Sequence, residues 1–149
     1  MNKRLIIRAD ASATIGVGHV MRCLTLARCW IEEKGPVTLV GQITGSSLRD
    51  YVKKFGVQLV NASDDKEAQR KLFELIDPNE EQAIVLDGYQ FTKELQQEIR
   101  RSGKPLLVID DYCHLASYET DILLNQNISA KEYDYSINSS ARLLLGTEF

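Results

Sequence analysis

The chain has little that would direct it to nucleic acid or to a membrane. Its 149 residues carry 18 basic and 21 acidic side chains, so a formal net charge of −3 leaves no basic field for a phosphate backbone. No apolar run approaches the length of a membrane span, and the run at residues 5–7 is too short for a signal peptide. We therefore expect a cytoplasmic protein with no nucleic acid partner and no membrane insertion.

Cysteine and histidine are scarce, with three and two residues respectively. Cys23 and Cys29 fall on one predicted helix and Cys113 stands apart, a pattern that fits neither a disulfide framework nor zinc spacing. The adjacent carboxylates Asp110 and Asp111 could offer oxygen ligands, but no further ligands follow at a recognisable spacing. We expect no metal and no cofactor.

What the sequence does contain is a regular alternation of short apolar runs with amphipathic helical patterns. The runs, which have strand length and no polar alternation, are residues 5–7, 37–40, 57–60, 83–86, 106–109, 122–124 and 143–145. Helices are expected over residues 18–34, 45–55 and 63–76 and from residue 92 onward. This order predicts an α/β fold, a Rossmann-like three-layer parallel sheet covered on both faces, in one domain over residues 1–149.

The loop after the first predicted strand is the most informative stretch. Gly16 and Gly18 allow backbone conformations closed to other residues and let a ligand approach the main chain. A dinucleotide site would need a small residue where Met21 stands, so NAD and FAD are not expected. His19 follows the second glycine at a helix start, where the helix dipole favours a neutral imidazole that can take a proton from water.

Polar residues follow several predicted strands, whose carboxyl ends meet at one edge of a parallel sheet. We predict His19 as the catalytic acid or base and Asp10 as the residue that orients it or hydrogen-bonds the substrate. The predicted substrate contacts are Ser12, Gly16, Gly18, Asp87 and Tyr89.

Each candidate has a purely structural alternative. His19 could cap its helix, and Asp10 and Ser12 could stabilise the turn of their own loop. Asp87 could cap the loop that follows it. His114, in a predicted surface loop, is expected to be solvated.

Several of these segments resemble a known enzyme family. The matching segments are IRADAS (7–12), IGVGHVMRCLTLA (15–27), VLDGY (85–89), IDD (109–111), DILLNQN (121–127) and LLG (144–146). They resemble the nucleotide-sugar hydrolases of pseudaminic acid biosynthesis, which release UDP from a UDP-linked diacetamido-trideoxyhexose. The closely related spore coat polysaccharide biosynthesis proteins share the same segments.

The resemblance implies hydrolysis of a UDP-linked amino-deoxy sugar for surface or spore coat polysaccharide of the nonulosonic acid type, with His19 as general base. It also implies a GT-B glycosyltransferase-like architecture, in which residues 1–149 form the N-terminal half and a nucleotide-binding C-terminal domain is absent. Gly88 departs from the family, which commonly has histidine there, and this bears on the identity of the sugar. A GT-B glycosyltransferase and a non-catalytic sugar-binding subunit remain as alternatives.

Overall fold

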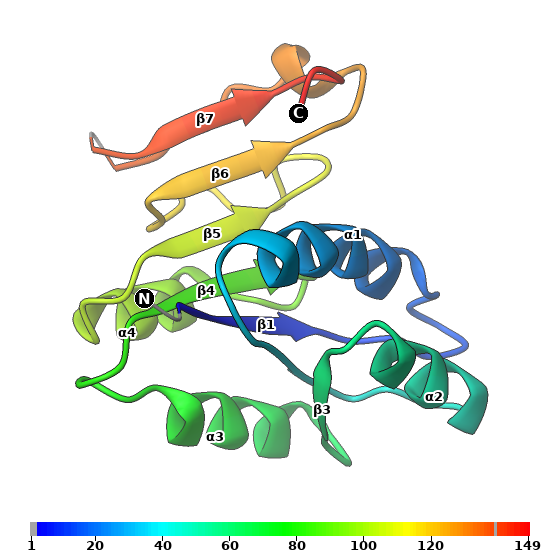
Figure 1. Cartoon of the computed structure of the whole chain (residues 1–149). Coiled ribbons are helices and arrows are strands. Elements are labelled where there is room, and N and C mark those ends of the chain that lie inside the picture. Colours follow the sequence, from blue (N-terminus) through cyan, green and yellow to red (C-terminus); the bar gives the residue numbers. More distant parts are fainter. Residues whose placement is uncertain (1–2, 139) are drawn as a thin grey trace.

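The apolar runs of the sequence form one parallel sheet in the computed structural model of the chain (Figure 1). The structure describes residues 3–138 and 140–149, and in these residues seven strands pair in parallel in the order β3-β2-β1-β4-β5-β6-β7. The strands are β1 (Arg4–Ala9), β2 (Val37–Gly41), β3 (Gln58–Asn61), β4 (Gln82–Asp87), β5 (Leu106–Ile109), β6 (Ile122–Asn125) and β7 (Arg142–Leu145). The helices are α1 (Gly18–Glu33), α2 (Ser46–Lys54), α3 (Asp65–Leu75), α4 (Lys93–Arg101) and the short 3₁₀ helix η1 (Ala130–Glu132). The predicted α/β class and Rossmann-like parallel sheet are confirmed.

The strand order reverses between β1 and β4. From β1 the chain moves outward to β2 and β3, then returns through α3 to the other side of β1 and continues from β4 to β7. In such a sheet the ligand crevice forms outside the carboxyl ends of the strands at the reversal. The register places Ala9 opposite Asp87, so the loops that leave β1 and β4 start side by side.

Successive side chains of β1 point to opposite faces of the sheet, as the period of a strand requires. Leu5 and Ile7 belong to the core under α1 and α2, whereas Ile6 belongs to the core under α3 and α4. Arg8 shares the face of Ile6 and reaches Asp65 at the start of α3. Polar side chains at consecutive positions near the end of a strand therefore point to opposite faces of the sheet.

Two of the predicted helix starts are confirmed by their caps. The carboxylate of Asp64 accepts a hydrogen bond from the backbone N of Glu67 at 2.8 Å, and the Glu67 carboxylate accepts one from the backbone N of Ser63 at 2.6 Å. These reciprocal bonds satisfy two free amides at the start of α3. The hydroxyl of Thr92 caps α4 in a similar way. In the described part of the chain, no helix has the length and apolar character needed to cross a membrane.

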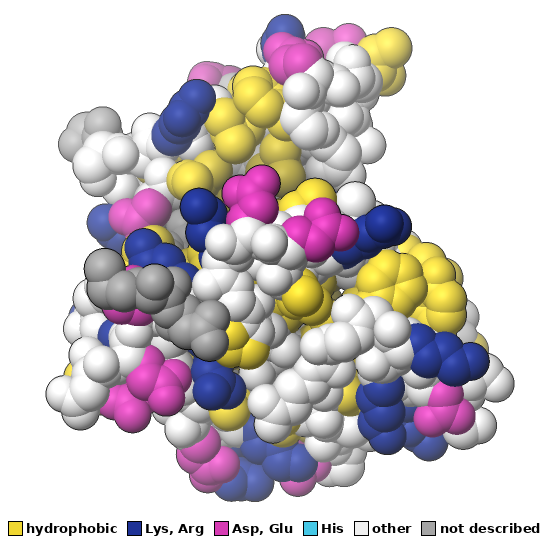
Figure 2. Space-filling model, in the orientation of Figure 1, with side chains coloured by type: hydrophobic (Ala, Val, Ile, Leu, Met, Phe, Trp, Pro, Cys, Tyr) yellow, Lys and Arg dark blue, Asp and Glu magenta, His cyan; other side chains and the backbone are white. Residues whose placement is uncertain are grey.

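One face of the sheet is incompletely covered. In the residues that the structure describes, α1 and α2 lie over β1 to β4, but no helix lies over β6 and β7 on that side (Figure 1). The connections after β5 and β6 run on the opposite face, where Tyr118 and Tyr135 join the core beside α4. The prediction that both faces are covered is therefore wrong for β6 and β7. Figure 2 shows hydrophobic side chains open to view there, and Ile122, Leu124 and Leu144 are only partly buried.

Candidate active site

The loop between β1 and α1 is held in shape by its own hydrogen bonds. The Ser12 hydroxyl accepts from the backbone N of Ile15 at 3.1 Å, and the Ser12 carbonyl accepts from the backbone N of Gly16 at 2.8 Å. Gly16 has a φ of +81°, a left-handed conformation that costs glycine nothing. The turn delivers the chain to Gly18, where α1 begins without a side-chain cap, and places His19 in the first turn of the helix.

Asp87 anchors the imidazole of His19. Nδ1 of His19 lies 2.7 Å from Oδ1 of Asp87, whose side chain is fully buried at the end of β4. A carboxylate can only accept a hydrogen bond, so we assign the hydrogen to Nδ1 on the shorter contact; Nη2 of Arg22, which is 3.2 Å from the same atom and is also a donor, then makes no hydrogen bond to it. No described residue hydrogen-bonds to Nε2 of His19, and the side chain is 10% exposed. With the hydrogen on Nδ1, the lone pair of a neutral imidazole lies on Nε2, the atom that a general base uses.

Arg22 ties together the aspartates that follow β4 and β5. It lies three residues after His19 on α1, and its Nε donates to Oδ2 of Asp87 at 2.6 Å while its Nη1 donates to Oδ1 of Asp111 at 2.6 Å. Burial disfavours the charge of Arg22, but the hydrogen bonds to both aspartates outweigh burial and raise its pKa above the ordinary value. Burial likewise opposes the charge of Asp111, yet hydrogen bonds from Arg22, Tyr89 and Asn127 lower the pKa of this carboxyl. The cluster is consequently a cation fixed between two carboxylates.

Tyr89 completes a ring of contacts around His19. Its hydroxyl donates to Asp111, and its aromatic ring meets the imidazole nearly at a right angle, with ring centroids 4.8 Å apart. Burial and the neighbouring Asp111 raise the pKa of the phenol, so the hydroxyl keeps its proton and remains a donor. The closed sequence of contacts runs through His19, Asp87, Arg22, Asp111 and Tyr89.

A cavity of about 520 Å³ opens beside His19 at the carboxyl ends of β1, β2 and β4. It is lined by Asp10, Thr14, Ile15, His19, Gln42, Asp65, Tyr89 and Gln90. None of these described lining residues is lysine or arginine, and the polar groups are carboxylates, carboxamides, hydroxyls and the imidazole of His19. Such groups suit the hydroxyls and amides of a sugar better than they suit phosphate.

Asp10 lines this cavity but does not hold His19. Its carboxylate accepts hydrogen bonds from Arg8, from the backbone N of Gln42 at 2.6 Å and from the side-chain amide of Gln90 at 2.6 Å. The prediction that Asp10 orients His19 is therefore wrong, because Asp87 occupies that place. Asp10 continues the alternation that turns Arg8 toward α3, whereas His19 begins a helix on the other face of the sheet.

The other predicted substrate contacts differ in their access to the cavity. Tyr89 lines it directly, and Asp87 contacts it only through His19. The hydroxyl of Ser12 accepts a hydrogen bond from within its own turn. Gly16 and Gly18 are exposed, and in the described chain no atom lies within 4 Å of the point where a side chain would begin at either glycine. The two glycines leave room for a ligand at the start of α1.

The position of Gly88 is filled by the side chains that follow it. A Cβ atom at Gly88 would lie 2.6 Å from Oε1 of Gln90 and 2.9 Å from Cε2 of Phe91. Gln90 in turn bonds Asp10, and the Phe91 ring lies under the guanidinium of Arg8. A histidine at position 88 would require Gln90 and Phe91 to move.

Asp110 and Asp111 do not form a chelating pair, because they point to opposite faces of the sheet. The buried carboxylate of Asp110 accepts from the hydroxyls of Tyr118 at 2.7 Å and Tyr135 at 2.9 Å, and from Nδ1 of His114. Burial opposes its charge, but these hydrogen bonds hold its pKa well below the usual range. The expectation of a solvated His114 is wrong, since its side chain is 7% exposed. Across the described residues, no three His, Cys, Asp or Glu side chains are grouped to hold a metal ion.

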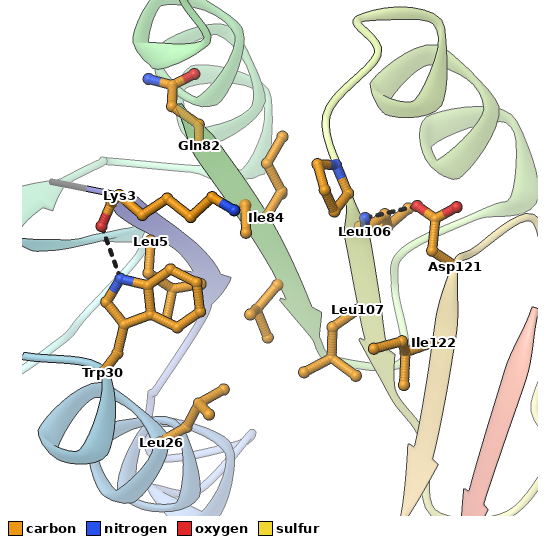
Figure 3. A pocket seen from close by; sticks show the side chains of 13 residues that line it. Lys3, Leu5, Leu26, Trp30, Gln82, Ile84, Leu106, Leu107, Asp121 and Ile122 are labelled. Atoms are coloured by element: carbon orange, nitrogen blue, oxygen red, sulfur yellow. Dashed lines mark hydrogen bonds between the residues drawn. The ribbon is translucent and has the colours of Figure 1, made fainter. Parts of the chain in front are cut away.

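A second cavity, of about 280 Å³, lies at the opposite ends of the strands (Figure 3). Its walls include Leu5, Leu107 and Ile122 from the sheet and Leu26 and Trp30 from α1. The labelled acid at its rim, Asp121, accepts a hydrogen bond from the backbone of β5. The charged lining residues of the cavity are Lys3, which is exposed, and Asp121, whose carboxylate is engaged by the β5 backbone, so this mainly apolar hollow is not a candidate for catalysis.

The chain matches no model of a known protein family. It is 28% identical over 133 residues to the UDP-2,4-diacetamido-2,4,6-trideoxy-β-L-altropyranose hydrolase of Campylobacter jejuni. The match covers 89% of this chain and 44% of that relative, so the chain spans less than half the length of the hydrolase. The resemblance to the UDP-sugar hydrolases seen in the sequence is thereby confirmed.

Proposed function

We propose that this chain carries the acid–base residues of a hydrolase that releases UDP from a UDP-linked amino-deoxy sugar. The observation that carries the proposal is the state of His19, whose Nδ1 is tied to buried Asp87 while Nε2 has no bonding partner among the described residues beside the cavity. The similarity to a UDP-sugar hydrolase over 89% of the chain supports the same reaction class.

In the proposed reaction, a water molecule attacks the anomeric carbon and the bond from that carbon to the UDP oxygen breaks. Nε2 of His19 accepts the proton of the water, and Asp87 stabilises the resulting imidazolium. The diphosphate leaves with the bonding electrons, and the uncapped amides at the start of α1 favour its negative charge. Asp10, Gln42 and Gln90 hydrogen-bond the polar groups of the sugar.

We further propose that UDP is held mainly by a second, C-terminal domain, as in a GT-B-type protein. Two observations support this arrangement: the chain covers 44% of its relative, and no basic side chain of the described residues lines the cavity. The released sugar would then enter a surface or spore coat polysaccharide of the nonulosonic acid type.

The test uses the full-length gene product and a UDP-sugar without any acceptor. A hydrolase yields UDP and free sugar under these conditions, whereas a glycosyltransferase needs an acceptor. The exchange His19→Ala should lower UDP release by about a hundredfold or more. Cys29→Ser, at an exposed position of the same helix, should leave it unchanged. Turnover of the His19 variant within a few-fold of wild type would contradict the proposal.

A further inference from the structure

Tyr89 and Tyr112 leave a large aromatic surface uncovered beside His19. Tyr89 is 42% exposed and Tyr112 is 47% exposed, and their ring centroids lie 4.8 Å apart. Exposed aromatic groups that adjoin a polar cavity are typical of ligand contacts. We propose that these two rings, the tyrosine platform, bind the C–H face of the substrate's sugar ring and the methyl groups of its N-acetyl substituents. The inference rests on the proposed hydrolase function and assigns the part of the ligand that these residues recognise.

The tyrosine platform is held rigidly from behind. The hydroxyl of Tyr89 donates to Asp111, which also accepts from Arg22 and Asn127. The backbone N of Tyr112 donates to Oδ1 of buried Asp110 at 2.8 Å. The His114 ring backs both tyrosines, with centroids 5.9 and 6.1 Å away. A surface fixed in this way loses little side-chain entropy when a ligand binds.

The position of the tyrosine platform selects the sugar as its ligand. The ring of Tyr89 lies 4.8 Å from the imidazole of His19, so a sugar whose anomeric carbon receives water from His19 lies within contact of Tyr89. The other cavity walls are polar and include Asp10, Gln42 and Gln90. A pyranose has the matching division, because its polar groups radiate from the ring edge while its faces present C–H bonds.

Tyr112 lies one ring farther from His19 than Tyr89 does, and it does not line the cavity. A group in that place contacts the substituents of the sugar and not its reacting carbon. Loss of this contact should weaken substrate binding and leave the chemical step unchanged. Tyr112 is therefore assigned a part in specificity, favouring N-acetylated deoxy sugars over fully hydroxylated ones.

The binding experiment uses this chain with ¹³C-labelled tyrosine, titrated separately with UDP-N-acetylglucosamine, N-acetylglucosamine and UDP. The ring signals of Tyr89 and Tyr112 should shift with the first two ligands and stay in place with UDP. Tyr51 on α2 is the matched control, because it is 42% exposed and packs against Phe55, so its signal should not move. Shifts caused by UDP alone, shifts of equal size at Tyr51, or no shift with any ligand would each overturn the proposal.

Kinetics of the full-length gene product separate this inference from the hydrolase function. Tyr112→Ala should raise KM for a UDP-linked N-acetylated sugar about tenfold with kcat within twofold, and Tyr112→Phe should behave as wild type. Tyr51→Ala should change neither constant. If Tyr112→Ala leaves KM unchanged while His19→Ala abolishes turnover, the tyrosine platform is wrong and the hydrolase stands. If wild-type protein releases no UDP, the hydrolase proposal fails and the labelled titration still decides on the tyrosine platform.

Discussion

Nδ1 of His19 lies 2.7 Å from Oδ1 of Asp87, although 68 positions separate the two residues along the chain. The bond links the first turn of α1 to the last residue of β4, and that residue pairs with Ala9 of β1 in the sheet register. The placement of the imidazole is thus set by a helix and two hydrogen-bonded strands. Sites built on such elements keep their geometry better than sites built on loops.

Replacement of Asp87 by asparagine should disturb the hydrogen position on His19. A carboxylate requires Nδ1 to be the donor, whereas an amide permits either ring nitrogen to carry the hydrogen, so hydrolysis should fall by about 10²- to 10⁴-fold. Long-range ¹H–¹⁵N spectra report which ring nitrogen carries the hydrogen. The signals are simple to assign because the chain has only two histidines. Asp10→Asn is the matched control and should leave the His19 signals in place. An unchanged His19 pattern in the Asp87 variant would refute the anchoring role.

Loss of Arg22 should destabilise the fold, because Asp87 and Asp111 would lose their shared cation. Arg22→Gln should lower the free energy of unfolding by about 2 to 4 kcal/mol, and Arg22→Lys by less, since lysine keeps the charge but not the forked donors. Arg28→Gln is the control on the same helix: Arg28 is exposed and pairs with Glu32 alone among the described residues, so its loss should cost under about 0.5 kcal/mol. Equal urea midpoints for the Arg22 and Arg28 variants would contradict this.

Asp110 should contribute stability that depends on pH. Its folded-state pKa lies below the unfolded value, so its contribution is complete above the unfolded pKa of about 4 and is lost as the pH falls toward the folded value. Asp110→Asn should therefore cost about 2 to 3 kcal/mol at pH 7, and the difference from wild type should shrink below about pH 4. Urea unfolding at pH 7, 5 and 3 measures both quantities. A difference that does not depend on pH would show that the carboxylate charge is irrelevant.

The two glycines before His19 should respond differently to alanine. Gly16→Ala places a side chain at a φ of +81° and should cost about 1 to 2 kcal/mol. Gly18→Ala meets no described atom within 4 Å and has no positive φ, so stability should hold or rise by up to about 1 kcal/mol. If the ligand approaches the start of α1, Gly18→Ala should still lower UDP release several-fold. Thermal denaturation and turnover are measured together, and full activity of this variant would remove Gly18 from the binding surface.

Most of the fold could be predicted because seven apolar runs alternate with amphipathic segments, and such strands have few other ways to be buried. The meeting of His19, Asp87 and Tyr89 at one sheet edge followed from the same rule. The prediction that Asp10 orients His19 was wrong because it did not extend the alternation of side chains along β1 to position 10. Arg8 and Asp10 share one face, and the histidine helix covers the other.

Arg22 and His114 were harder to place from sequence. An arginine on a helix is usually solvated. The feature that could have indicated a role for Arg22 is its spacing of three residues from His19, which puts both side chains on one side of α1. His114 is buried by a turn in which Cys113 adopts a φ of 58° and donates its backbone N to Asp110. Non-glycine residues in this conformation are uncommon, so no sequence pattern predicted the turn.

The bare side of β6 and β7 has a consequence for handling this chain on its own. Leu124 and Leu144 are only partly buried, in an apolar area over which no described helix lies. Such an area attracts hydrophobic dyes and other copies of the same chain, so light scattering and dye fluorescence should both increase with protein concentration. Colloidal behaviour, and not the strength of the fold, would then set the highest concentration at which the isolated chain can be studied.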